Sequence, residues 1–171
     1  MGKKRKPLRE VELEDIITSA LQDNDSDAKD IILKTQLALE ALLIEHIQLF
    51  KINESVPFQF PEKCDLLVNL GAISEATGLS YRNFNKLRND CIHLFGFQID
   101  LPKLRELISS LESNGIDFSD SPNNYSDENA LEFFGDIRGI ASYIGWNLLE
   151  HQAVLLNLSG GRDIYAAPEE H

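Results

Sequence analysis

Three side chains within six residues are of the types that act on an anionic group: Arg88, Asn89 and His93. An arginine fork matches the oxygens of a phosphate, and an imidazole changes its charge near neutral pH. On a helix, Asn89 and His93 lie four residues apart and share a surface. The spacing therefore predicts that one of this pair positions a group that the other protonates.

The helix that must carry these residues has an apolar face and a polar face. At roughly 100° per residue, Arg88 projects onto the apolar face. Because a buried guanidinium keeps its charge, we expect Arg88 to meet a carboxylate, a line of carbonyl groups or an anion from outside. Glu45 and Asp65 on neighbouring helices are the candidate carboxylates. The apolar face comprises Phe84, Leu87, Cys91, Ile92, Leu94 and Phe95, and the polar face Arg82, Asn85, Lys86, Asn89 and His93.

The charge of the chain is unevenly distributed. Its 16 Lys and Arg against 28 Asp and Glu give a net charge of -12, which argues against a protein that coats nucleic acid with its whole surface. Residues 78–105 are the interior exception, since they hold more basic than acidic side chains. We expect an anionic ligand to be drawn to this segment first. The basic run at residues 3–6 is typical of a solvated terminus, with a nucleic-acid arm or nuclear localisation signal as the alternative.

Composition favours one intracellular globular domain. The 171 residues, 43% hydrophobic and 26% charged, suffice for one core and exclude a wholly disordered chain. No signal peptide or membrane-spanning segment is expected. Two cysteines, Cys64 and Cys91, match neither a disulfide scaffold nor a zinc motif. We therefore expect a cytoplasmic protein without a metal or cofactor.

Apolar periodicity predicts an all-α fold, an up-and-down bundle of five or six helices. Helices are expected over residues 10–21, 28–50, 61–70, 80–94, 101–113 and 127–158, with Ser80 and Ser126 as N-caps. We divide the chain into a basic tail (1–9), a helical core (10–115), a polar connection or linker (116–126), a C-terminal helix packing on the core (127–159) and a tail (160–171). His46 and His151, among apolar residues, are expected to be satisfied buried histidines.

The stretch from Leu87 to His93 resembles the R-N-x-x-x-H motif of the HEPN superfamily, which consists of small α-helical domains that include metal-independent ribonucleases. The Leu70-Gly71-Ala72-Ile73 turn before the motif helix, and the long apolar helix upstream, are similar to the mannitol-operon-repressor-like branch. The resemblance covers roughly residues 28–113.

The resemblance implies a homodimer in which two motif helices face each other and form one composite site for an RNA phosphate. Arg88 would stabilise charge on the phosphate, Asn89 would orient the phosphate or the histidine, and His93 would act as general base or acid. Glu45 and Asp90 are auxiliary candidates. This chemistry needs the ribose 2′-hydroxyl and no metal.

Two functions remain open at this point. One is a metal-independent endoribonuclease in a toxin or stress-defence setting, with an antitoxin or another protein as a possible partner. The other is a non-catalytic HEPN module, mannitol-repressor-like, that regulates or assembles by binding a protein or nucleotide. A direct reader of DNA is the least supported, because no basic recognition helix is evident.

Overall fold

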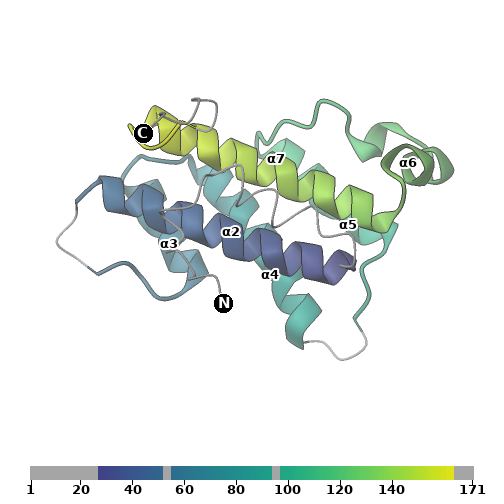
Figure 1. The fold of residues 1–171 in the computed structure, drawn as a ribbon, viewed down its shortest axis with the longest axis horizontal. Helices are drawn as coiled ribbons and strands as arrows, with labels where there is room; N and C mark the ends of the chain where they lie inside the picture. The colour runs from purple at the N-terminus through teal and green to yellow at the C-terminus, as the bar shows by residue number, and fades with distance from the viewer. Residues whose placement is uncertain (1–26, 52–54, 94–96, 164–171) are drawn as a thin grey trace, which may run out of the picture.

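The computed structural model describes residues 27–51, 55–93 and 97–163, and within these ranges helices are its only regular secondary structure. Figure 1 shows a helical bundle, which confirms the predicted all-α class. The expected helix over residues 10–21 lies outside the described residues, as do residues 1–9 and 164–171. The α-helices are α2 (Ala28–Leu49), α3 (Phe60–Asn69), α4 (Glu75–His93), α5 (Leu101–Ser113), α6 (Asp127–Phe134) and α7 (Ile137–Leu158), with a short 3-10 helix η2 (Pro122–Asn124).

The centre of the bundle is formed by α2 and α7, which lie side by side and run in the same direction (Figure 1). Both helices have 22 residues. Leu39 and Leu43 of α2 and Ile144 and Leu148 of α7 are fully buried. Helix α2 is apolar around much of its circumference because α3 and α4, as well as α7, pack against it.

Local capping signals set the bounds of α3 and α5 as the sequence predicts. Gly71, with φ of 69°, ends the turn after α3 in the left-handed region that glycine adopts without strain. Asp100 caps α5, since its Oδ1 accepts from the backbone N of Lys103 at 3.0 Å. Gly115, with φ of 88°, follows the end of α5. In the sequence, α4 lies between these two helices.

Two predicted bounds are wrong. Ser80 does not cap α4; it is fully buried inside that helix, which begins five residues earlier at Glu75. The predicted single helix over residues 127–158 is two helices, because Gly135 has φ of 88° and interrupts the ladder. Asp136 then starts α7 by accepting from the backbone N of Gly139 at 2.9 Å. The Ser126 cap is confirmed, but it belongs to α6.

The polar connection over residues 116–126 packs on the bundle and is not a loose linker. Ile116, Phe118 and Ser121 in it are buried. The Asn123 Nδ2 donates to Ser109 Oγ of α5 at 2.9 Å. The Phe118 ring lies 5.8 Å from that of Tyr143 on α7. The connection is therefore held to α5 by a side-chain hydrogen bond and to α7 by an aromatic contact.

Candidate functional site

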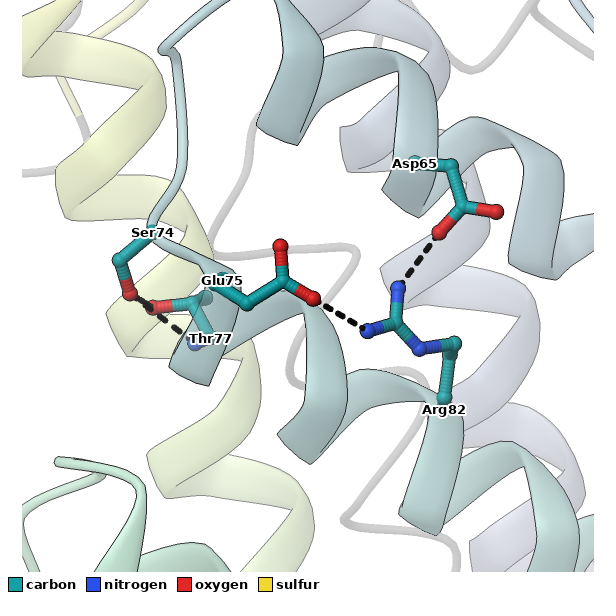
Figure 2. A network of polar contacts seen from close by, with 5 residues as sticks. All are labelled: Asp65, Ser74, Glu75, Thr77 and Arg82. Atoms are coloured by element: carbon teal, nitrogen blue, oxygen red, sulfur yellow. Dashed lines mark hydrogen bonds and ion pairs between the residues drawn. The ribbon is translucent and has the colours of Figure 1, made fainter.

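Helix α4, which carries the motif, is fixed to α3 near its N-terminal end (Figure 2). Arg82 donates from Nη1 to Asp65 Oδ1 of α3 at 2.6 Å and from Nη2 to Glu75 Oε1 at 3.4 Å. Ser74 is the N-cap that the sequence analysis assigned to Ser80, since its Oγ accepts from the backbone N of Thr77 at 3.0 Å.

Close packing reinforces this anchor. A Cβ on Gly78 of α4 would lie 2.9 Å from Cγ2 of Val68 on α3, so the glycine permits the close approach of the two helices. Tyr81 and Phe84, on the next turns of α4, are fully buried. The N-terminal half of α4 is therefore a rigid support for the residues at its C-terminal end.

The motif residues lie together at that C-terminal end and are open to solvent. Arg88 and Asn89 are half-buried, and Arg88 Nη1 donates to Asn89 Oδ1 at 2.9 Å. His93 is exposed and is the last residue of α4. The side chain of His93 makes no hydrogen bond within the described ranges. Arg88 and Asn89 thus form a bonded pair, one turn before the exposed imidazole of His93.

Arg88 is half-buried, and within the described residues neither candidate carboxylate pairs with it. Asp65, one expected partner, binds Arg82, and Glu45, the other, binds Arg162. Across the described residues, the Arg88 guanidinium has no ion pair. Arg88 stays half-exposed because it lies near the end of α4, where the predicted apolar face also reaches solvent: Ile92 is 46% exposed. Leu94 and Phe95, the remaining members of that face, lie outside the described residues.

Glu45 is distant from the motif. Its Oε1 accepts from Arg162 Nε at 2.8 Å and its Oε2 from Arg162 Nη2 at 2.7 Å, a two-pronged pair at the C-terminal ends of α2 and α7. The end of α4 lies instead near the start of α2: burial raises the pKa of the Cys91 thiol, and the positive charge of Lys29 partly offsets this rise. Sixteen residues of helix separate Lys29 from Glu45, about 24 Å along the axis. Glu45 therefore cannot support Arg88 in the same chain.

The positive charge of residues 78–105 is largely neutralised by carboxylates near each cation. Arg82 pairs with Asp65 and Glu75, Lys103 pairs with Asp100, and Arg105 pairs with Asp127 at 3.1 Å. In the described part of this segment, only Lys86 and Arg88 have no ion pair. Both lie on α4, so the free cationic character gathers on the motif helix.

Asp90, the second auxiliary candidate, lines a pocket of about 380 Å³ between α4 and α5. Asn83 of α4 and Ser110 of α5 are hydrogen-bonded across it, with Nδ2 to Oγ at 2.8 Å. The motif side chains Arg88, Asn89 and His93 do not line this pocket. Asp90 thus lies on a different face of α4 from the other residues of the candidate site.

A buried polar network, which the sequence alone did not indicate, joins α4, α7 and α2. The Tyr81 hydroxyl donates to Gln152 Oε1 at 3.0 Å, and Gln152 Nε2 lies 2.9 Å from His46 Nδ1. The His46 Nε2 lies 2.7 Å from Ser159 Oγ, at the end of α7. Burial lowers the pKa of His46 and raises that of Tyr81. The satisfied histidine predicted at position 46 is confirmed.

His151 departs from the same expectation. Its Nε2 is buried and has no hydrogen-bond partner among the described residues, and burial lowers its pKa. The residue lines a second pocket of about 290 Å³ with Asp117, Asn147 and Glu150. This pocket is lined mainly by α7 and shares no residue with the motif on α4.

The cysteines and acids show no metal centre in the described part of the chain, where no group of three or more candidate ligands is found. Both cysteines are unpaired. Burial raises the pKa of the Cys64 thiol to about 12, so this thiol is unreactive at neutral pH. Burial also raises the pKa of Cys91.

Among the described helices, none has the length and hydropathy to cross a bilayer. No family model, curated protein or solved structure matches this chain.

Proposed function

We propose that the protein is a metal-independent endoribonuclease of the HEPN type, with Arg88, Asn89 and His93 in its active site. One observation carries the proposal: Arg88 lacks a carboxylate partner in the described residues, although acidic side chains engage three nearby cations. A guanidinium without an ion pair in the described part of the chain, bonded to Asn89 one turn before the exposed His93 imidazole, is suited to bind an anion from outside.

The chemistry uses only the RNA and these side chains. The 2′-hydroxyl of the ribose attacks the adjacent phosphorus while a His93 imidazole accepts its proton. A bond forms between O2′ and phosphorus, and the bond from phosphorus to O5′ breaks. The departing O5′ takes a proton from a second imidazole. Arg88 stabilises the negative charge that develops on the phosphate oxygens, and the products are a 2′,3′-cyclic phosphate and a 5′-hydroxyl.

This reaction uses a general base and a general acid, and the motif of one chain supplies one imidazole. A second copy placed with its α4 against the first would bring two His93 side chains to one phosphate. It would also cover Ile92, an apolar side chain that is 46% exposed beside the motif. We therefore propose a homodimer that assembles the site between two α4 helices.

The first test incubates the purified full-length protein with a labelled structured RNA in EDTA, beside His93→Ala. Cleavage by the wild type alone, with 2′,3′-cyclic phosphate ends, supports the proposal. Intact RNA from a folded dimer contradicts it. Arg88→Gln should also abolish cleavage, with Lys51→Gln as its control, since Lys51 is an exposed cation at the other end of α2.

The cellular setting we propose is the cytoplasm, where RNA is available and free thiols such as Cys64 and Cys91 persist. A toxin or defence role would require a partner that restrains the nuclease, such as an antitoxin. Co-purification of a protein that blocks cleavage would support this setting.

A non-catalytic HEPN module is the second candidate, and the charge distribution favours it. The net charge of -12, with Arg82, Lys103 and Arg105 all neutralised within the fold, suits a surface that binds protein better than one that binds a polyanion. In that case RNA stays intact and Arg88→Gln weakens association with a protein partner.

A further inference from the structure

The pocket between α4 and α5 is lined by charged side chains that are not part of the motif. Helix α4 contributes Lys86 and Asp90 to its lining, and α5 contributes Lys103 and Glu106. Each helix thus supplies one cation and one carboxylate. The volume of about 380 Å³ is within the range of small-molecule sites.

Most of these charges are not neutralised within the fold. Within the described residues, Lys86, Asp90 and Glu106 make no ion pair and no side-chain hydrogen bond. Lys86 and Asp90 are four residues apart on one helix, the spacing at which opposite charges commonly pair, and they do not pair here. Four charged groups therefore share one concave surface while three keep their hydrogen-bonding capacity for a ligand.

The remaining lining is apolar and includes an aromatic ring. Leu87 of α4 and Leu107 of α5 are buried beneath the charged rim. Phe97 is half-buried, and Lys103 Nζ lies 5.3 Å from the centroid of its ring. A flat group can pack on this apolar lining while its polar edges meet the charges.

We propose that this pocket binds one nucleotide of the RNA, with its base against Phe97 and the two leucines and a phosphate near Lys86 and Lys103. The inference rests on the ribonuclease function proposed above. Asp90 directly follows Asn89, so the pocket and the motif occupy adjoining faces of α4. A nucleotide held in the pocket would fix the strand beside Arg88.

The carboxylates give this site a base preference. Guanine has two N–H donors, at N1 and N2, on one edge, and a carboxylate accepts both with its two oxygens. Uracil offers one N–H donor between two carbonyl oxygens, which a carboxylate repels. Asp90 and Glu106 therefore favour guanine over uracil.

The test measures binding of guanosine and uridine monophosphates to the full chain by calorimetry. Guanosine monophosphate should bind saturably and more tightly than uridine monophosphate. Glu106→Gln should weaken guanosine monophosphate binding about tenfold, the effect typical of losing a two-pronged contact to a base. Glu112→Gln is the matched control, because it removes the same charge from α5 outside the pocket lining. Failure of guanosine monophosphate to bind, or equal effects of the two variants, overturns the inference.

The binding assay and the cleavage assay separate the two proposals. Cleavage of RNA by a protein that binds no mononucleotide overturns the pocket inference and leaves the nuclease. Binding of guanosine monophosphate at a site sensitive to Glu106, by a protein that leaves RNA intact, overturns the nuclease and retains the pocket as a nucleotide site. Helical circular dichroism of Glu106→Gln, compared with that of the wild type, verifies that the variant is folded.

Discussion

Removing the Tyr81 hydroxyl tests the buried network between α4, α7 and α2. Tyr81→Phe leaves the ring in place and deletes the donor that Gln152 Oε1 accepts at 3.0 Å. Tyr81 and Gln152 are both fully buried, so water cannot replace the lost donor. An unpaired buried acceptor costs about 1–3 kcal/mol.

The expected change is therefore a loss of about 2 kcal/mol in the free energy of unfolding. For a chain of this size, that loss lowers the melting temperature by about 4–8 °C. Urea unfolding monitored by circular dichroism measures the free energy, and an unchanged dependence on urea concentration would show that the folded state keeps its compactness.

Tyr143→Phe is the matched control. The Tyr143 hydroxyl accepts from the backbone N of Asp120 at 3.0 Å in an exposed setting, where water can replace it. This variant should change stability by less than about 0.5 kcal/mol. Equal effects of the two substitutions would refute the reasoning. The double variant Tyr81→Phe with Gln152→Leu should lose less than the sum of the single losses, since both remove the same bond.

Three further perturbations probe other parts of the fold. Burial holds the pKa of His46 below 6.5, so the folded protein keeps this ring neutral while the unfolded chain protonates it. The free energy of unfolding should be at its full value above pH 6.5 and should fall as the pH decreases below 6.5, by at most about 1.4 kcal/mol per pH unit for each such histidine. His151, whose pKa burial also lowers, should likewise destabilise the fold on acidification. A urea midpoint that rises on acidification to pH 5.5 would contradict this expectation. Gly139→Ala should destabilise the junction of α6 and α7 by about 2 kcal/mol or more, because an added Cβ would lie 1.7 Å from the carbonyl oxygen of Phe134; an unchanged melting temperature would show that this turn relaxes freely. Glu45→Gln should lower the unfolding free energy by about 1 kcal/mol, since it weakens a partly buried two-pronged pair with Arg162; an unchanged urea midpoint would assign that pair no role in holding the two C-terminal ends together.

The helices that the sequence predicted well are those whose ends carry local signals. Asp100 and Gly115 act within one turn of the helix they delimit, so α5 could be bounded without knowledge of the fold. At α4 the sequence predicted Ser80 as the cap, whereas Ser74 caps the helix in the structure. Gly78 lies inside this helix, at the point where α3 approaches closely, and this contact between helices cannot be deduced from the local sequence.

The candidate site was predictable in its residues and not in their partners. The spacing of Asn89 and His93 on one helix follows from the sequence alone. The partner of Arg88 does not, because which acid reaches which cation depends on how helices distant in sequence pack. Asp65 was a sound candidate by charge, but the fold brings it to Arg82, two turns earlier on the same helix.

The pairing of α2 with α7 sets the order of events during synthesis. His46 and Ser159 are hydrogen-bonded across 113 residues of sequence, so α2 emerges from the ribosome long before its main partner exists. At about 5–20 residues per second, that interval lasts about 6–23 s. Throughout it, Leu39 and Leu43 have no α7 to cover them. The nascent chain is then exposed to aggregation and is a natural client for a chaperone, and the bundle closes only when its last helix has been translated.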